Sequence, residues 1–168
     1  MAEFNPAFER MIVNEGGYKL HKVAGDTGGQ TYAGIARNMN PHWPGWVAID
    51  AGDVPATALV RSFYKAEFWD RVAGDRINEQ RVAENIFDFG VNAGWKTSAK
   101  LAQVVVGATP DGVVGPATLE RLNLYDANLF MAQFALAKLT RYRDIVARDR
   151  TQQKFLLGWI NRTLKDAA

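Results

Sequence analysis

Apolar residues recur at helical spacing along most of this chain, and strand-type patterns are confined to residues 18–31. In the first such segment, residues 6–15, Phe8, Met11 and Ile12 fall on one face of a helix. The same spacing, read with cap and turn residues, predicts further helices over residues 32–39, 53–72, 81–92, 97–107 and 126–148, and others beginning at 116 and 151. The sequence therefore predicts a mainly α fold.

Cap and turn residues set the limits of the first elements. Asn5 can accept hydrogen bonds as an N-cap, and Pro6 suits the first helical position. The glycine-rich residues 18–30 are predicted to form a long loop or a small irregular hairpin after this helix. Thr31 is predicted to cap the short helix that follows, and residues 40–53 are predicted to be mostly turns.

Later helices also have start signals. Thr97 or Ser98 can cap the helix that ends near Gly107, and Pro116 opens the next helix. Asp126 stands where it can cap the longest predicted helix. These signals divide the second half of the chain into a series of helices joined by short turns.

The chain has 168 residues, the length of one ordinary domain, and we expect residues 1–168 to form one. A chain of this size buries roughly 70% of the surface that its unfolded form exposes, so it needs no metal or disulfide to fold. Gly74 and Asp75 mark a change of subregion, between residues 4–73 and residues 75–165.

The absence of cysteine excludes several kinds of chemistry. Thiol catalysis, thiolate zinc sites and disulfides all require cysteine. His21 and His42 are the two histidines, so we expect no metal site and no cofactor.

Charge and hydropathy narrow the expected partners. Twenty basic and eighteen acidic side chains give too small an excess for a dedicated nucleic-acid-binding protein. The apolar stretch 129–137 is interrupted by Gln133 and is too short to cross a bilayer. The N-terminus lacks the pattern of a signal peptide. We therefore expect no nucleic acid as partner, no membrane insertion and no export by a signal peptide.

Glu15 is the first candidate for chemistry. It stands in the last turn of the predicted first helix, before Gly16 and Gly17, where the helix dipole disfavours a negative charge. The same field favours the protonated carboxyl and raises its pKa, as a general acid requires. The alternative is a solvated glutamate that happens to precede a glycine cap.

Asp26 is a possible partner for Glu15, because the glycine-rich segment between them can fold back. Glycoside hydrolysis uses two carboxyl groups, of which one donates a proton and the other activates water or stabilises the cationic sugar. Asp26 could equally be a turn residue that bonds its own backbone. Thr31 could position a water molecule, or it could be only the N-cap described above.

Four sequence blocks, in the same order, resemble the N-acetylmuramidases of glycoside hydrolase family 108. They are Glu-Gly-Gly-Tyr at 15–18 with Asp-Thr-Gly-Gly-Gln-Thr at 26–31 and Gly-Ile at 34–35, Phe-Asp-Phe-Gly-Val-Asn-Ala-Gly at 87–94, Asp-Gly at 111–112 with Gly-Pro at 115–116, and the segment 155–162. The last block resembles the end of a predicted peptidoglycan-binding segment. Thr27 stands where the family more often has proline.

This resemblance implies a lysozyme-like helical fold and hydrolysis of the β-1,4 bond after N-acetylmuramic acid in peptidoglycan. The family's catalytic glutamate falls on Glu15, and a Glu–Asp–Thr arrangement falls on Glu15, Asp26 and Thr31. Residues 4–73 then form a catalytic segment, and residues 75–165 a peptidoglycan-binding-like one. The protein would be a monomer made in the bacterial cytoplasm, and it would act on the cell wall after release, as phage endolysins do.

Substrate contacts are expected from two groups of residues. Asp88 and Asn92 are one helical turn apart and could bond sugar hydroxyls, or could instead tie the helix end to a neighbouring loop. The rings of Tyr18, Tyr32 and Trp95 could pack against sugars. Trp43 and Trp46, in the turn-rich stretch, are candidate rim residues.

Two other functions stay open at this point. A lytic transglycosylase also needs one essential acid, but it forms an anhydro product without consuming water. A non-catalytic wall-binding module would agree with the resemblance of the C-terminal segment.

Overall fold

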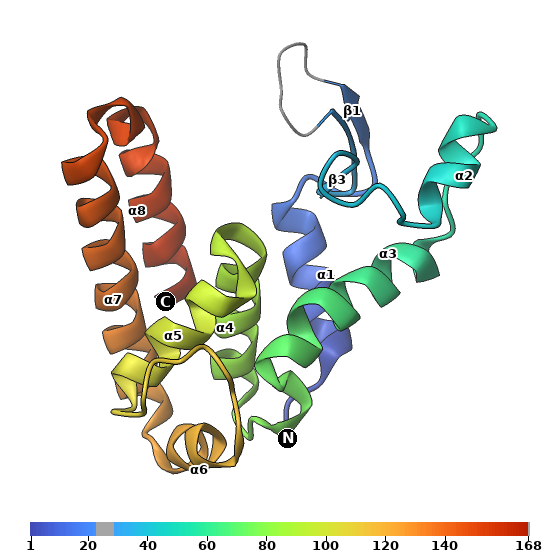
Figure 1. Cartoon of the computed structure of the whole chain (residues 1–168). Coiled ribbons are helices and arrows are strands. Elements are labelled where there is room, and N and C mark those ends of the chain that lie inside the picture. The colour runs from blue at the N-terminus through green and yellow to red at the C-terminus, as the bar shows by residue number, and fades with distance from the viewer. Residues whose placement is uncertain (23–28, 168) are drawn as a thin grey trace.

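The computed structural model describes residues 1–22 and 29–167. Over these residues the chain forms eight α-helices, α1 Phe4–Asn14, α2 Gly45–Asp50, α3 Thr57–Tyr64, α4 Gln80–Ala93, α5 Trp95–Val105, α6 Pro116–Leu124, α7 Ala127–Arg148 and α8 Gln153–Ala167. One small sheet contains β1 Leu20–Lys22, β2 Gln30–Tyr32 and β3 Ile35–Ala36. The π-helical turn η1 Lys65–Trp69 and the 3₁₀ turns η2 Asp70–Val72, η3 Gly74–Arg76 and η4 Arg150–Gln152 complete the order. The predicted mainly α fold is confirmed (Figure 1).

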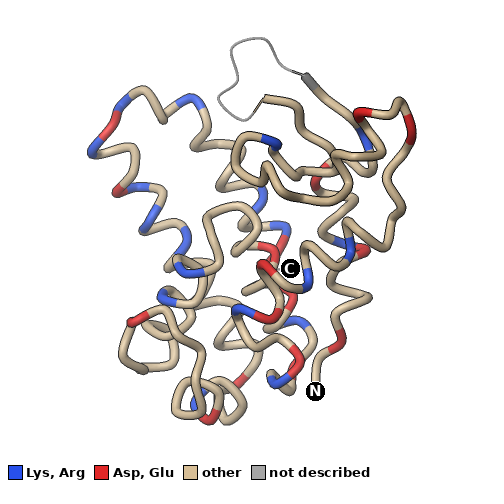
Figure 2. Tube along the Cα trace, turned by 45° about the vertical axis from the view of Figure 1, so that its right-hand side comes forward, with Lys and Arg blue, Asp and Glu red and all other residues tan. Residues whose placement is uncertain are grey.

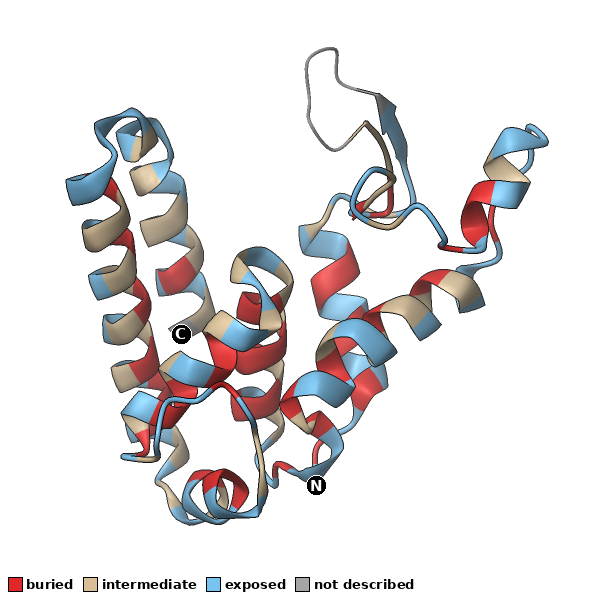
Figure 3. Ribbon diagram, viewed as in Figure 1, coloured by how far each residue is buried: buried red, intermediate tan, exposed pale blue. Residues whose placement is uncertain are grey.

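Helix α4 is the central element of the fold. It contacts α1, α5 and α7, and its buried side chains include Ile86, Phe87 and Phe89. The ring of Phe87 packs edge-on against Phe4 and Trp69, which joins α1 and η1 to the centre of the molecule. In Figure 3 the buried residues of α4 and α5 lie on the sides of these helices that face their neighbours.

Helices α7 and α8 form an antiparallel pair next to α4 and α5 (Figure 1). The Asp126 side chain accepts a hydrogen bond of 2.8 Å from the Leu129 N–H, so the predicted cap of α7 is confirmed. Near the other end of the pair, the rings of Tyr142 and Trp159 stack with their centroids 4.9 Å apart. This packing fixes α8 on α7 and so determines where the side chains of α8 point.

The sheet is antiparallel in the order β1–β2–β3. The predicted hairpin after α1 is therefore present. Thr31 pairs with His21 on one side and with Ala36 on the other. The prediction of a short helix over residues 32–39 was wrong. These backbone pairings instead place residues 30–32 and 35–36 in strands.

Several predicted element limits also differ from the structure. Helix α1 begins at Phe4 rather than Pro6, and the Asn5 side chain accepts a hydrogen bond from Arg61 instead of capping the helix. Ser98 donates its hydroxyl hydrogen bond to the Ile86 carbonyl and caps nothing. In both cases a tertiary partner replaces the expected local one.

The segment from residue 40 to residue 72 shows the largest differences. Residues 45–50 form α2 where turns were predicted, and Trp43 and Trp46 are buried against each other instead of lying on a rim. The helix predicted over 53–72 begins at Thr57 and gives way to a π turn and two 3₁₀ turns after Tyr64. Ala73, between the two 3₁₀ turns, adopts the left-handed conformation with φ 52°.

Charged residues of both signs are interspersed along most of the chain (Figure 2). Within residues 1–22 and 29–167, no helix combines the length and the apolar character that a bilayer crossing requires. Over the same residues, no three His, Asp or Glu side chains are grouped as metal ligands.

Candidate active site at the end of α1

Glu15 follows the last residue of α1, and its position depends on the two glycines after it. The Glu15 N–H donates to the Met11 carbonyl at 3.0 Å, so the backbone is still helical here. Gly16 and Gly17 then adopt φ of 85° and 79°, and the Gly17 N–H donates to the Ile12 carbonyl at 2.9 Å. This left-handed ending satisfies the last carbonyls of the helix and turns the chain away. The Glu15 side chain remains beside the helix end and is 23% exposed.

The turn between β2 and β3 closes one side of the Glu15 carboxyl. Gly34 lies in this turn with φ 80°, and a Cβ atom at this position would stand 3.1 Å from Glu15 Oε2 and overlap the Tyr64 hydroxyl. The Tyr64 hydroxyl donates to the Ala33 carbonyl at 2.8 Å and so fixes the turn. Burial, and then the negative charge of Glu15, raise the pKa of Tyr64, which keeps its hydroxyl protonated as a donor.

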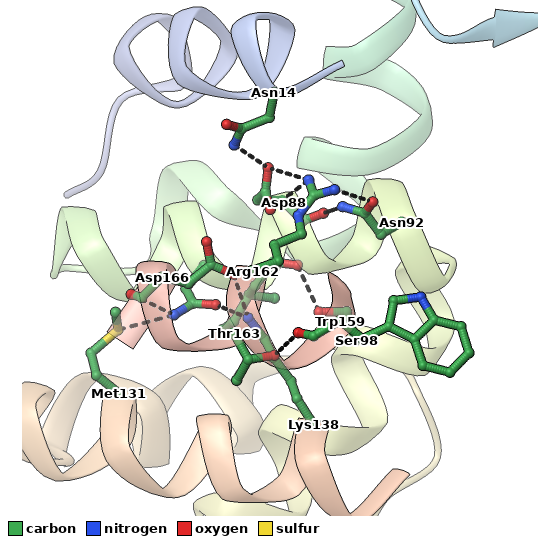
Figure 4. Close-up of polar contacts among 12 residues, drawn as sticks. Asn14, Asp88, Asn92, Ser98, Met131, Lys138, Trp159, Arg162, Thr163 and Asp166 are labelled. Atoms are coloured by element: carbon green, nitrogen blue, oxygen red, sulfur yellow. Dashed lines mark hydrogen bonds and ion pairs between the residues drawn. The ribbon is translucent and has the colours of Figure 1, made fainter. Parts of the chain in front are cut away.

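A second side of the carboxyl is formed by Arg162, which comes from α8. Its Nη2 atom lies 3.8 Å from Glu15 Oε1 and donates to both carboxylate oxygens of Asp88, at 3.1 and 3.0 Å. The Nη1 atom donates to the Asn92 side-chain oxygen. Asp88 also accepts a longer hydrogen bond, 3.4 Å, from the Asn14 amide. Figure 4 shows Arg162 reaching across to Asp88 and Asn92 on α4, with Asn14 on α1 on the other side.

This surrounding favours the protonated form of Glu15. Burial makes the largest contribution and raises the pKa of Glu15, Arg162 lowers it, and Asp88 raises it. We expected a raised pKa from the helix dipole, but desolvation of the half-buried carboxyl is the main cause in the structure. Asp88 also forms a direct ion pair with Arg162, so the positive charge of Arg162 acts on Glu15 only in part.

Asp88 and Asn92, proposed as sugar ligands from the sequence, are brought to this site. Both bind Arg162, and the Asn92 amide also donates to the Asp88 backbone carbonyl at 2.7 Å. The alternative prediction was that these two residues tie the end of the helix to a neighbouring part of the chain. The contacts agree with it, and the neighbouring part is α8. Asn92 is exposed, while the Asp88 carboxylate is mostly covered.

The other candidate residues differ in burial and in distance along the chain from this site, and one of them lies outside the described residues. Asp26 lies outside the described residues, and Thr31 is half-buried in β2. Tyr18 is 37% exposed just before β1, and Trp95 is half-buried with the Arg71 guanidinium 5.8 Å from its ring centre. Tyr32 is only 3% exposed and stacks on Trp43, so its ring is not offered to a ligand and we remove it from the expected sugar contacts.

Arg162 is the residue that the sequence reasoning missed as a member of this site. The sequence alone gives Arg162 no role here, because nothing in it places residue 162 beside residue 15. One signal pointed to a functional role for this residue. The segment 155–162, which ends at Arg162, is one of the four sequence blocks that resemble the family. The structure brings this segment onto the block that contains Asp88 and Asn92.

Comparison with protein families agrees with this geometry. The family described as Glycosyl hydrolase 108 matches residues 8–94, which include Glu15, Asp88 and Asn92. The chain belongs to glycosyl hydrolase family 108. Residues 97–164, which include Arg162, match the family described as Predicted Peptidoglycan domain. Together the two matches identify the protein as a glycoside hydrolase, and they place it in a family of enzymes that hydrolyse peptidoglycan. The ion pair between Asp88 and Arg162 thus joins the two matched segments.

A solved structure of SagA from Brucella abortus has a similar fold. The TM-score is 0.73 over 98% of this chain and 91% of that chain, with 24% sequence identity. This likeness shows that the two chains share a fold over nearly their whole length. A search of curated proteins finds no match to the chain.

Proposed function

We propose that this family-108 protein is an N-acetylmuramidase that cleaves the β-1,4 bond between N-acetylmuramic acid and N-acetylglucosamine in peptidoglycan. The observation that carries the proposal is the Glu15 carboxyl, which is half-buried, has a raised pKa and lies beside an Arg162–Asp88 ion pair. A general acid must hold its proton near the working pH, and burial of a carboxyl achieves this.

In the proposed reaction Glu15 donates its proton to the glycosidic oxygen as the bond to the anomeric carbon breaks. The sugar then develops oxocarbenium character and needs a negative charge or an activated water on its other side. We assign this second role to Asp26, with Thr31 orienting the water. Thr31 lies in β2, whose following turn contains Gly34 and borders Glu15.

Arg162 acts in this proposal as a positioning residue. It holds Asp88 and Asn92 in place and stands near Glu15, while Asp88 balances its charge so that Glu15 is not driven to ionise. Direct sugar contacts are assigned to Tyr18, Asn92 and Trp95, which are exposed or half-buried.

We also propose an endolysin type of action. The protein would be made in the bacterial cytoplasm, would reach the wall after release, and would work as a monomer. The small positive excess of its charged residues would favour approach to an anionic wall through long-range attraction.

The proposal is tested by measuring release of reducing sugars from purified peptidoglycan. The Glu15→Gln variant should lose activity by about 100-fold or more, because it keeps the shape of the side chain but has no proton to donate. Glu120→Gln, an exposed change on α6, is the matched control and should keep full activity. Near wild-type activity of Glu15→Gln would contradict the assignment of the acid.

The products separate this reaction from its alternatives. Mass spectrometry should find ordinary reducing N-acetylmuramic acid ends, which carry one water more than anhydro ends. Anhydro ends would show a lytic transglycosylase. Wall binding without any released sugar would show a non-catalytic module.

A further inference from the structure

A cavity of about 510 Å³ lies between α1, α4, α7 and α8, next to the Glu15 site but separate from it. Glu15 does not line this cavity, whereas its neighbour Asn14 and the Arg162 partner Asp88 do. Ala7, Met11 and Met131 supply buried apolar surface. The volume lies in the range of sites that bind small organic ligands. Figure 4 shows one side of its lining, with Asn14 on α1, Asp88 on α4 and Met131 on α7.

The acidic side chains of the lining are all neutralised by cations. Glu84 pairs with Arg10, and Asp166 pairs with Lys138 at 3.0 Å. The other two pairs are Glu9 with Arg61 at 2.6 Å and Asp88 with Arg162 at 3.0 Å. Of the four cations in these pairs, Arg10 lines the cavity and the other three do not.

Two cations of the lining are left without such a partner. Among the described residues, neither Arg81 nor Lys165 forms an ion pair with a carboxylate. Arg81 donates to the Asn128 side-chain oxygen at 2.7 Å, and Lys165 makes a longer bond of 3.4 Å to Asn14. Both side chains are exposed at the edge of the cavity. The lining holds four carboxylates and three cations, but the four carboxylates are all paired, so the charges left unbalanced beside the apolar surface are those of Arg81 and Lys165.

The two cations are separated along the axis of α4. Lys165 contacts Asn14, whose amide bonds Asp88, and Arg81 lies seven residues before Asp88 on α4. Seven residues of α-helix span roughly 10 Å. An extended peptide covers this distance with about three residues. The spacing suits a short chain with a carboxylate toward each end.

We propose that this cavity binds the acidic stem peptide that peptidoglycan carries on N-acetylmuramic acid. Arg81 and Lys165 would each bind one of its carboxylates, and the small side chains of the peptide would pack on Ala7, Met11 and Met131. The identity of the peptide rests on the proposed function, because the substrate named there carries such a peptide at the sugar next to the cleaved bond. The cavity would then recognise the wall peptide while the Glu15 site acts on the glycan.

The test measures binding of a free stem peptide by titration calorimetry, which needs no catalysis. The probe is the tetrapeptide L-Ala–γ-D-Glu–meso-diaminopimelate–D-Ala, and the protein is the full chain carrying Glu15→Gln. Binding should saturate at one peptide per chain. The double variant Arg81→Gln/Lys165→Gln, on the same background, should weaken binding by about tenfold or more, because each lost ion pair contributes to the affinity. Arg150→Gln, an exposed change between α7 and α8, is the matched control and should leave the affinity unchanged.

A second probe tests the role of charge. The same tetrapeptide with its carboxylates converted to amides should bind much more weakly than the acidic form. Equal binding of the two peptides, equal binding by the double variant, or no saturable binding at all would each overturn the proposal. Competition by acetate as strong as that by the peptide would show an unspecific anion site and would overturn it too. None of these results depends on glycan cleavage, so failure here is distinct from failure of the muramidase assignment.

Discussion

Two polar clusters connect α8 to the rest of the molecule, and they differ in burial and in their neighbours. In the first, Arg162 of α8 binds Asp88 and Asn92 of α4, and Glu15 stands beside it with Oε1 3.8 Å away. In the second, Lys138 of α7 binds Asn85 of α4 and Asp166 of α8.

The cation of the second cluster is buried, while the cation of the first is partly exposed, and we call them the closed and the open cluster. The Lys138 side chain is 1% exposed, and its ammonium nitrogen lies 5.1 Å from the ring centres of both Phe89 and Phe134. The Arg162 side chain is 30% exposed. Burial lowers the pKa of Lys138, and Asp166 opposes this shift. We infer from this comparison that the closed cluster holds α8 in place. The open cluster depends on the position of α8 and determines the charges around Glu15.

The largest effect on stability is expected from the closed cluster. Asp166→Asn removes the counter-charge of Lys138 and leaves a buried cation without an ionic partner. The free energy of unfolding should fall by about 2 to 3 kcal/mol, near the lower limit for a buried pair because Asp166 is 17% exposed. Chemical denaturation at neutral pH measures this loss.

The control for this change is Asp144→Asn, which removes an acid of an exposed pair with Arg143 on α7. A surface pair contributes between 0 and about 1 kcal/mol, so the control should differ little from the wild type. Equal effects of the two substitutions would show that the closed cluster does not anchor α8 as described.

The open cluster should affect catalysis through the pKa of Glu15. Asp88→Asn keeps the shape of the side chain but removes a charge that raises this pKa, and it leaves the charge of Arg162 unbalanced. The pKa of Glu15 should fall. In the proposed reaction Glu15 acts in its protonated form, so the alkaline limb of kcat/KM should move to lower pH, with a several-fold loss of activity at neutral pH. A pH profile that keeps its shape and only loses height would indicate a different role for Asp88.

The opposite shift is expected from Arg162→Gln, with a smaller loss of activity. This change removes the charge that lowers the pKa of Glu15, so the pKa should rise and the alkaline limb should move to higher pH. The unpaired Asp88 should cost about 1 to 2 kcal/mol of unfolding free energy. The same pH profile, recorded with Arg150→Gln as control, distinguishes this shift from a general effect of net charge. Movement of both variants in the same direction would contradict the account of the open cluster.

Local signals in the sequence predicted the parts of the site that depend on local structure. The Gly16–Gly17 pair placed Glu15 at the end of α1, and Asp126 marked the start of α7. Arg162 could not be assigned in this way, because its contact with Asp88 depends on how α8 packs against α4. Physical reasoning from one sequence gives the face of a helix, but it does not give the partner that this face will meet.

The errors in the fold have the same origin. The apolar pattern over residues 53–72 indicated one helix, whereas the structure changes to π and 3₁₀ turns that place Trp69 fully in the core. There its indole N–H donates to Asp75 at 2.6 Å. Thr31 had the side chain of an N-cap, but pairing with His21 and Ala36 took it into a sheet. In each case a contact that a continuous helix cannot make outweighed the local preference.

The central claim is that the pKa of Glu15 is raised because the carboxyl is half-buried beside an arginine whose charge Asp88 balances. The most direct test is NMR titration of the Glu15 side-chain carboxyl in the wild-type chain and in Asp88→Asn. The account predicts a wild-type midpoint above that of an ordinary glutamate, and a lower midpoint in the variant. A wild-type midpoint at or below the ordinary value would contradict it.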